Sequence, residues 1–371
     1  MELIGSCISG GPDSDGEKAR PASPDPKSTW GDDCHGHAGL LTCSNPACWP
    51  QIPRAMNTLP SRTTKSVLKA TTQRIQAIAL NAFWHLVRLM PPAASAATGS
   101  AIFRFVGPRT RKQAFIRRNL ARIFPRHEPR QIEAVAREVW GNFGAVLAEY
   151  PHLHYYCSDA SAPDFDIHVA PETAAIVASR QPAVYVAAHL ANWELATAAI
   201  TRLGIPFSAV YAPQGNPFVD RMLQQRRHAL GCRFIGKNHA IRRLIGELGA
   251  GRSVGLLSDQ RSDAGELLPF FGSPAMTTIS PAWLALRFGC PLIPVRVERI
   301  GPARYRTSLC APLTTPGSAS DRAGVIALSC ALNALFESWI RSRPEQWLCM
   351  RRRWPAPQNA LSTRSSLQPC N

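Results

Sequence analysis

Short apolar runs alternate with longer segments of helical periodicity over residues 182–343. The short runs predict buried strands at 183–189, 206–212, 253–259, 291–300 and 304–313. The longer segments, whose apolar residues recur every three or four positions, predict helices at 193–204, 216–231, 239–251, 280–289 and 321–343. Alternating strands and helices are typical of an α/β fold, in which helices flank a mainly parallel or mixed sheet. The last two strands are expected to be neighbours.

A different pattern precedes the sheet. Apolar side chains at helical spacing in the stretch 75–92 are Ile75, Ile78, Ala79, Ala82, Phe83, Leu86 and Met90. The stretch is shorter than the roughly 20 apolar residues that span a bilayer. It therefore favours an amphipathic helix lying in a membrane interface, with Trp84 at headgroup depth. A core helix of a soluble domain fits these residues equally well. Two further helices are predicted, a strongly basic one within 107–127 and another at 129–147.

These patterns divide the chain into four parts. Residues 1–55 have the low hydrophobicity of a disordered leader, or result from a misassigned start, because residues from Met56 onward read like an ordinary bacterial N-terminus. Residues 56–128 are expected to form membrane-associated amphipathic and basic helices. Residues 129–355 are expected to form the α/β domain, and residues 356–371 a loose tail.

The charge of the chain points to an anionic partner. The 371 residues include 42 Lys and Arg against 25 Asp and Glu, a formal net charge of +17. Such a surface suits an acidic membrane or an acidic carrier or substrate. Nucleic acid is not expected, because the basic residues are not interleaved with aromatic platforms and no recognition module is evident. The strands are not followed by a glycine-rich phosphate loop, so we expect no nucleotide cofactor. The N-terminal Cys and His residues between 34 and 48 lack paired zinc spacing, so no metal is expected.

The candidate chemistry lies at the end of the strand at 183–189, in the sequence AAHLANWELA. Asn192 is a good N-cap that would start the next helix at Trp193, placing His189 at the strand end and Glu194 in the first helical turn. We expect the turn to fold the imidazole back towards this carboxylate. A carboxylate that holds one ring nitrogen protonated leaves the other free to act as a general base. The base could activate a hydroxyl for attack on an acyl carbon.

The spacing alone is a weak signal. A second pair at the same spacing, His154 and Asp159, follows no predicted strand and is read as coincidence. A histidine at a strand end is more often structural than catalytic, and this alternative stays open on the residues alone.

Several motifs surround the histidine in a fixed order, and together they carry a resemblance. They are RRNLARIFP (117–125), WGNFGAVLAEY (140–150), AAHLANWELA (187–196), YAPQGNPFVDRMLQQRR (211–227), the long block 258–299 and RPEQWLCMRRRWP (343–355). In this order the chain resembles the bacterial lipid A biosynthesis acyltransferases, the late lauroyl/myristoyl acyltransferase family. The resemblance covers roughly residues 70–355.

The resemblance implies an enzyme of the cytoplasmic face of the inner membrane. It would move a fatty acyl group from acyl carrier protein to a hydroxyl of an acylated glucosamine lipid, without metal or cofactor. The catalytic dyad implied is His189 and Glu194. The substrate-binding residues implied, or suggested for an acyl channel or phosphate contact, are Asn192, Trp193, Asn216, Asp220, Arg226, Asp259, Gln260, Phe270 and Phe271. Core packing is an equal alternative for the two phenylalanines, and a solvated helix face is one for the arginines.

Three departures from the family pattern concern the acceptor more than the chemistry. Ala212 stands where the family usually has arginine, Arg261 where an acidic residue often follows Asp-Gln, and Arg351 where a histidine is usual. The same transfer to a lysophospholipid, a phosphatidylinositol mannoside or an ornithine lipid therefore remains an alternative. Hydrolysis of the acyl donor and a non-catalytic, basic membrane-surface protein are the others.

Overall fold

The computed structural model describes residues 62–157, 164–238, 240–314 and 321–355. Within it, the described residues from Thr72 onward belong to one compact unit, and Arg62–Thr71 belong to another. The predicted leader, its Cys and His residues, Asp159 and the tail lie outside the described residues.

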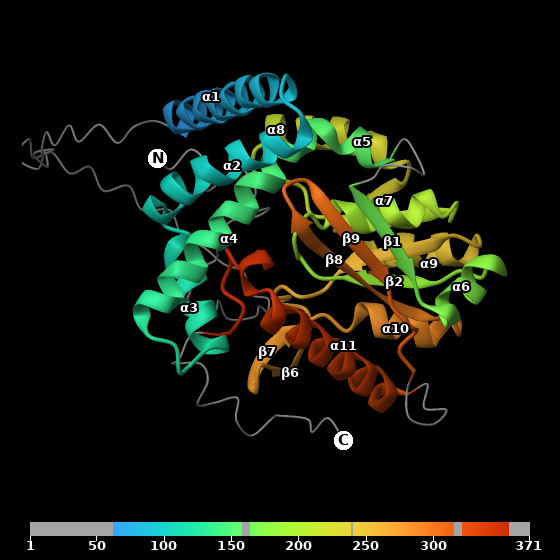
Figure 1. Ribbon diagram of the computed structural model, residues 1–371. Helices are drawn as coiled ribbons and strands as arrows, with labels where there is room; N and C mark the ends of the chain where they lie inside the picture. The colour runs from blue at the N-terminus through green and yellow to red at the C-terminus, as the bar shows by residue number, and fades with distance from the viewer. Residues whose placement is uncertain (1–61, 158–163, 239, 315–320, 356–371) are drawn as a thin grey trace, which may run out of the picture. The chain divides into compact units, whose positions relative to one another are not determined.

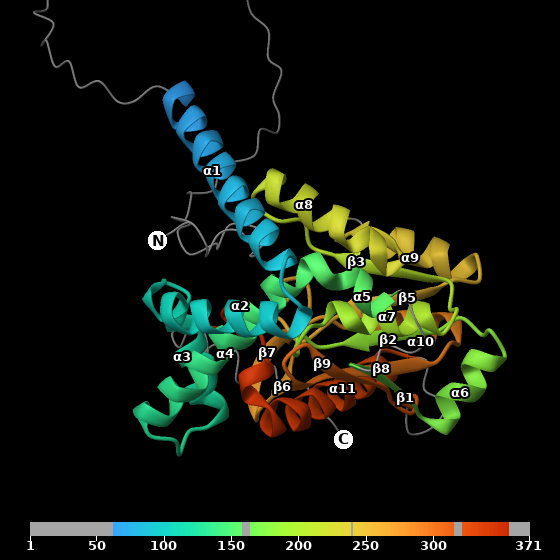
Figure 2. The same ribbon diagram turned by 45° about the horizontal axis from the view of Figure 1, so that its top comes forward.

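A seven-stranded sheet organises this unit. Its strands are β1 (Phe165–Val169), β2 (Val184–Ala187), β3 (Phe207–Tyr211), β4 (Arg233–Gly236), β5 (Ser253–Leu257), β8 (Leu292–Gly301) and β9 (Arg304–Leu309). They lie in the order β1-β9-β8-β2-β5-β3-β4. The five strands from β8 to β4 are parallel, while β9 is antiparallel to β8 and β1 is parallel to β9. Figure 2 shows the strands side by side across the sheet, with β3 towards one edge and β1 at the other. The predicted α/β fold with a mainly parallel, mixed sheet is confirmed.

Helices lie on both sides of the sheet (Figure 1). The helices are α1 (Arg62–Arg88), α2 (Pro92–Val106), α3 (Gln113–Ile123), α4 (Pro129–Glu149), α5 (Leu153–Cys157), α6 (Pro171–Ala178), α7 (Glu194–Arg202), α8 (Pro217–Arg227), α9 (Ala240–Gly249), α10 (Ser280–Phe288) and α11 (Arg322–Ser342). Short 3₁₀ turns are η1 (Gly107–Arg109), η2 (Tyr150–His152), η3 (His228–Leu230) and η4 (Pro344–Gln346). A separate hairpin of β6 (Glu266–Phe270) and β7 (Ser273–Thr277) packs against α11.

Local sequence explains several of the helix ends. The side chain of Asn216 accepts hydrogen bonds from the backbone N–H groups of Phe218 and Val219, so it caps the N-terminus of α8. Gly289 ends α10 in the left-handed conformation that glycine adopts without strain, as the sequence predicts. Asp321 caps α11 by accepting from the N–H of Gly324.

The helix predicted at 75–90 forms, but Trp84 does not lie at its surface. This tryptophan is only 1% exposed, and its indole N–H donates to the carbonyl of Leu147 in α4. The expectation that Trp84 lies at headgroup depth is therefore wrong. The apolar stripe named from the sequence is largely on the other side of α1, where Ile75, Ile78 and Leu86 are more than half exposed.

The described residues contain one helix, α11, that is long and apolar enough to cross a membrane by length and composition. Much of it, however, is buried inside the unit against α10 and β6. A core helix has the same composition, so α11 is weak evidence for a membrane span.

Candidate active site

The register of the sheet brings two predicted site residues together. Strands β2 and β5 are parallel neighbours, and their last residues, Ala187 and Leu257, are register partners. His189 and Asp259 each follow two residues later. Because β2 and β5 end at the same edge of the sheet and in register, the side chains of His189 and Asp259 meet. The Nδ1 atom of His189 lies 2.7 Å from Oδ1 of Asp259.

The carboxylate of Asp259 is held on both sides. Its other oxygen, Oδ2, accepts a hydrogen bond of 2.8 Å from the indole N–H of Trp347. Asp259 is fully buried. Burial by itself raises its pKa, but the charge and hydrogen bond of His189, with the bond from Trp347, outweigh burial and leave the pKa below its ordinary value. Asp259 is therefore an anion suited to hold a proton on Nδ1 of the imidazole.

Glu194 lies elsewhere. Its carboxylate forms a buried ion pair with Arg227, whose Nε atom lies 3.0 and 3.1 Å from the two oxygens, and it accepts a hydrogen bond of 2.8 Å from the hydroxyl of Tyr150. The predicted contact between His189 and Glu194 is thus wrong, because Arg227 from α8 occupies the carboxylate and the turn directs the imidazole to β5. A catalytic role for Glu194 stays a prediction that these contacts do not test.

The turn between the two residues also differs from the expected cap. Helix α7 begins at Glu194 with Trp193 at its N-cap, and no side chain bonds to the free N–H groups there. Ala191 adopts a left-handed conformation with φ of 49°. Asn192 points away from the helix and donates from Nδ2 to Glu149. The predicted cap is wrong because a carboxylate buried in α4 binds the amide instead.

A segment near the end of the described chain supports the turn. The N–H of Ala191 donates to the carbonyl of Gln346, and the N–H of Leu348 donates to the carbonyl of His189, each over 2.9 Å. Residues 346–348, which we call the strap, therefore pair with the histidine turn like a short antiparallel strand. Because Trp347 lies in the same strap, it supports His189 and Asp259 at once.

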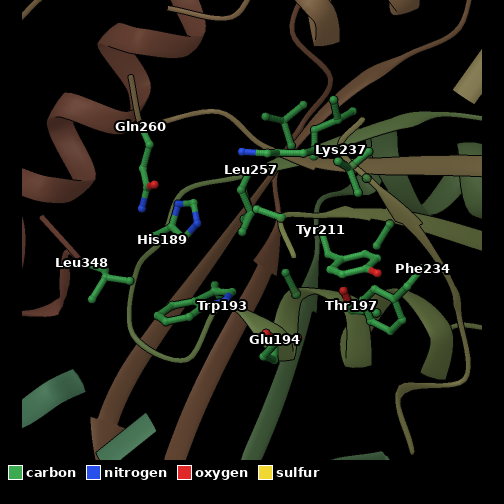
Figure 3. A pocket seen from close by; sticks show the side chains of 18 of the residues that line it. His189, Trp193, Glu194, Thr197, Tyr211, Phe234, Lys237, Leu257, Gln260 and Leu348 are labelled. Atoms are coloured by element: carbon green, nitrogen blue, oxygen red, sulfur yellow. The ribbon is translucent and has the colours of Figure 1, made fainter. Parts of the chain in front are cut away.

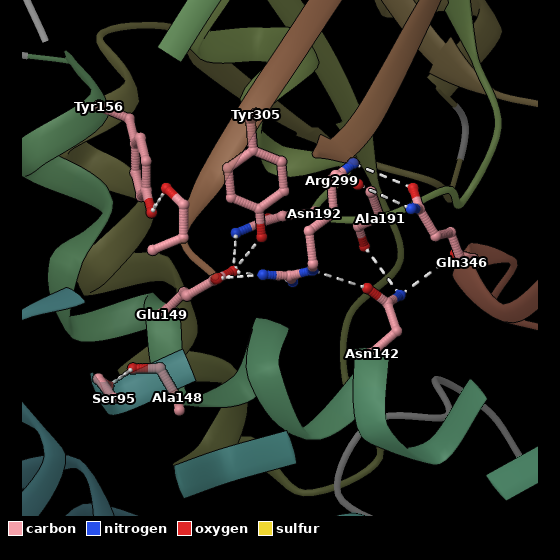
Figure 4. Close-up of polar contacts among 11 residues, drawn as sticks. Ser95, Asn142, Ala148, Glu149, Tyr156, Ala191, Asn192, Arg299, Tyr305 and Gln346 are labelled. Carbon is pink, nitrogen blue, oxygen red and sulfur yellow. Dashed lines mark hydrogen bonds and ion pairs between the residues drawn. The ribbon is translucent and has the colours of Figure 1, made fainter. Parts of the chain in front are cut away.

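A buried polar network lies behind the turn (Figure 4). Glu149 accepts hydrogen bonds from Asn192, from the hydroxyl of Tyr305 and from both terminal nitrogens of Arg299. The Nε atom of Arg299 donates to Asn142, whose amide in turn donates to the carbonyls of the turn and the strap. The network joins α4, β8 and β9 to the histidine turn. Within it, the buried charges of Glu149 and Arg299 balance each other. Sequence reasoning missed it, although Glu149 belongs to a block that resembles the family.

A cavity of about 670 Å³ opens at this edge of the sheet and reaches His189, Trp193, Glu194 and Gln260. Figure 3 shows these side chains around the space, with Thr197, Tyr211 and Phe234 farther from the histidine. The ring of His189 is 18% exposed, and within the described chain its Nε2 atom has no hydrogen-bond partner. The free nitrogen of the imidazole is thus available to a substrate.

Three predicted binding residues do not line this cavity. Asn216 caps α8 and donates to Gln73 and Gln76 of α1. Asp220 accepts from the backbone of Gln214, and Arg226 stacks over the ring of Trp84, 5.7 Å from its centre. A binding role for these three residues stays a prediction.

Phe270 and Phe271 do not line the cavity either. Both are buried, and their rings pack with each other and with Trp354. The alternative of core packing describes them, because the β6–β7 hairpin turns them towards the aromatic cluster beneath α11.

The arrangement has the parts of a general base. One ring nitrogen of His189 is held by a buried anion, the other faces a cavity, and no serine or cysteine lies in the turn to serve as a nucleophile. In the described residues, groups of three or more Cys, His, Asp or Glu side chains that could hold a metal are absent. The site suits the activation of a hydroxyl that the substrate brings.

Known proteins that resemble this chain were found among protein families and among solved structures. The family model described as bacterial lipid A biosynthesis acyltransferase matches residues 63–356. Among solved structures, the chain is similar to the 1-acyl-sn-glycerophosphate (LPA) acyltransferase PlsC from Thermotoga maritima, at 14% identity and a TM-score of 0.31, over 73% of this chain and 98% of that one. The search of curated proteins found no match.

Proposed function

Because this chain belongs to the bacterial lipid A biosynthesis acyltransferase family, we propose that it transfers a fatty acyl group from acyl carrier protein to a hydroxyl of an acylated glucosamine lipid. The observation that carries the proposal is the His189–Asp259 pair, whose free Nε2 atom faces the cavity. The net charge of +17 supports an acidic carrier protein and a phosphorylated acceptor as substrates.

The proposed reaction needs one proton carrier. Nε2 of His189 takes the proton of the acceptor hydroxyl as its oxygen attacks the thioester carbonyl, and Asp259 stabilises the imidazolium that forms. The tetrahedral intermediate then collapses with cleavage of the carbon–sulfur bond. The imidazolium returns the proton to the leaving thiolate, so the products are an ester and the free thiol of the carrier.

The oxyanion of the intermediate needs hydrogen-bond donors. The N-terminus of α7 beside Trp193 is one candidate, because its first N–H groups have no capping side chain. Arg227 is a second candidate, because its Nη1 atom is buried without a partner in the described residues and the side chain lines the cavity.

We also propose that the enzyme works at the cytoplasmic face of the inner membrane. The exposed apolar side chains of α1 and α2, among them Ile78, Leu86 and Phe105, support contact with lipid. Arg88 on α1 and Arg109 in the turn after α2 add positive charge that suits an anionic leaflet.

The test is mass spectrometry of lipid A from a strain without its late acyltransferases, complemented with the wild-type gene, with His189→Ala or with His154→Ala. His154 is the matched control, because it is an exposed histidine in α5, outside the turn that carries His189. We expect lipid A to gain one acyl chain with wild type and the control, and none with His189→Ala. A gain with His189→Ala would refute the general-base role, and no gain with wild type would direct the search to other lipid acceptors.

A further inference from the structure

Three positions at which the chain departs from the family pattern come together in the structure. They are Ala212, Arg261 and Arg351, and they belong to three separate segments. All three line the cavity that reaches the imidazole of His189. Ala212 brings no charge to the cavity, whereas each arginine brings a positive one. The departures therefore change the charge around the cavity and leave the histidine–carboxylate pair as it is.

Both arginines lie close in the chain to residues beside the imidazole. Figure 3 shows Gln260 and Leu348 near His189 at the wall of the cavity. Gln260 immediately precedes Arg261, and Leu348 of the strap shortly precedes Arg351. An anion bound by these arginines would therefore lie near the catalytic end of the cavity, where the two substrates meet.

A small recess adjoins the cavity at this point. The residues that line both are Gln260, Arg261, Leu348 and Arg351. Arg352 and Arg353 also line the recess, and among the described residues no aspartate or glutamate does. With a volume of about 10 Å³, the recess has room for about one water molecule. An anion held by its arginines would thus lie over the recess, at the mouth of the cavity.

The guanidinium of Arg353 is buried at this recess among neutral groups. Its Nη1 atom donates to the carbonyl of Met276, and its Nη2 atom donates to the hydroxyl of Thr277. Its Nε atom is buried and has no partner in the described part of the chain. Burial lowers the pKa of Arg353 to about 10, because a buried cation loses its hydration. A negative charge bound at the recess would offset this cost.

The other two arginines extend from supported segments. Arg261 pairs with Asp263 through Nε alone, and Asp263 is 73% exposed. Such an exposed pair contributes little stability, so the guanidinium can turn to a ligand. The backbone that carries Arg351 is fixed on α3, because Nδ2 of Asn119 donates to the carbonyls of Cys349 and Arg351. A supported backbone lowers the entropy that the side chain loses when a ligand binds.

We propose that Arg261 and Arg351 bind a phosphate group of a substrate at the mouth of the cavity, and that the buried charge of Arg353 strengthens this binding. Guanidinium groups suit phosphate because their N–H donors match its oxygens in pairs. The assignment rests on the proposed acyl transfer, in which two phosphates take part. One belongs to the glucosamine acceptor and the other to the phosphopantetheine arm of the carrier protein, and the test separates them.

The test compares each phosphorylated substrate with its phosphate-free counterpart. The acceptor is supplied with and without its phosphates, and the donor is an acyl thioester of either phosphopantetheine or pantetheine. KM and kcat are measured for wild type, Arg261→Gln, Arg351→Gln and the matched control Arg287→Gln. Arg287 is an exposed arginine of α10 that lines neither the cavity nor the recess.

A hydrogen bond to a charged group changes affinity by about 10- to 100-fold. We therefore expect Arg261→Gln and Arg351→Gln to raise KM for one phosphorylated substrate at least about 10-fold, without a change in kcat or in KM for its phosphate-free counterpart. Arg287→Gln should match wild type. A selective rise with the acceptor assigns the site to the acceptor phosphate, and one with the donor assigns it to the phosphopantetheine phosphate. An unchanged KM in both variants, or an equal rise with the phosphate-free substrates, would overturn the proposal.

A binding measurement covers the case in which wild-type enzyme transfers no acyl group. Isothermal titration calorimetry with inorganic phosphate needs no catalysis. Weaker binding with Arg261→Gln and Arg351→Gln than with Arg287→Gln supports the site, whereas equal binding or none in all of these proteins contradicts it. The absence of transfer by itself contradicts only the proposed function.

Discussion

Replacing Asp259 by asparagine tests which carboxylate serves His189. Asparagine keeps the shape of the side chain and removes its charge. In the structure the imidazole Nδ1 atom and the Asp259 carboxylate are 2.7 Å apart, and the carboxylate is fully buried. In the variant, the imidazolium that forms as the hydroxyl loses its proton has no anion beside it. The amide can also hold the ring in the wrong tautomer, with the proton on Nε2.

The expected loss follows from the charge interaction. Two unit charges about 4 Å apart attract by about 4 kcal/mol at the effective dielectric constant of about 20 that suits protein sites. The imidazolium exists only in the transition state and intermediate, so its loss of stabilisation acts on kcat. At about 1.4 kcal/mol for each factor of ten, we expect kcat to fall about 1,000-fold with little change in KM.

The assay is steady-state transfer from a charged acyl carrier protein, run beside Glu194→Gln and with unfolding by urea for each protein. Glu194→Gln leaves Arg227 buried without its carboxylate, and removing one partner of a buried ion pair costs about 3–5 kcal/mol of stability. We expect its main defect in the urea midpoint. The reasoning is refuted if Asp259→Asn keeps kcat within about 10-fold of wild type while Glu194→Gln, with an unchanged urea midpoint, shows the large fall in kcat instead.

Three further changes probe the surroundings of the site. Trp347→Phe removes the second hydrogen bond to the buried carboxylate, and at about 1.5–3 kcal/mol for a bond to a charged group it should lower kcat by at least about 10-fold; unchanged kcat would show that the strap does not orient the anion. Glu149→Gln should lower the free energy of unfolding by about 3–5 kcal/mol in urea, since Arg299 stays buried, and a loss below about 1 kcal/mol would contradict a net role for this pair. Burial raises the pKa of Tyr185 to about 12, against about 10 in the unfolded chain. The buried neutral phenol therefore stabilises the fold fully below about pH 10, and this stabilisation is lost as pH rises towards 12. Tyr185→Phe should flatten the alkaline fall in the urea midpoint, and an identical fall in both proteins would contradict this reasoning.

Local patterns predicted the elements well because each depends on near neighbours in the chain. The helix expected at 280–289 forms as α10 and ends at Gly289, and the two strands after it form the expected adjacent pair. The strands β1 and β4 were missed because they are only five and four residues long, too short for a clear periodic signal. The β6–β7 hairpin was missed because Pro269 and Pro274 weaken the strand signal.

The partner of the histidine could not be read from local sequence. His189 and Glu194 are close in the chain, which suggested a contact, whereas Asp259 is 70 residues away and meets His189 only because β2 and β5 are adjacent. One signal was present: both polar residues follow a buried strand by the same interval. Strand order depends on the packing of the whole domain, so that signal acquires its meaning only with the topology.

The position of the strap in the chain has a consequence for synthesis. Gln346 and Trp347 follow every strand of the sheet in chain order, and yet they pair with the turn that begins at His189. A nascent chain halted after α11 would hold all the sheet residues and both members of the histidine–carboxylate pair without the segment that supports them. We therefore expect a chain that ends after α11 to lack activity, because the histidine turn and Asp259 would lose the hydrogen bonds that Gln346, Trp347 and Leu348 make with them.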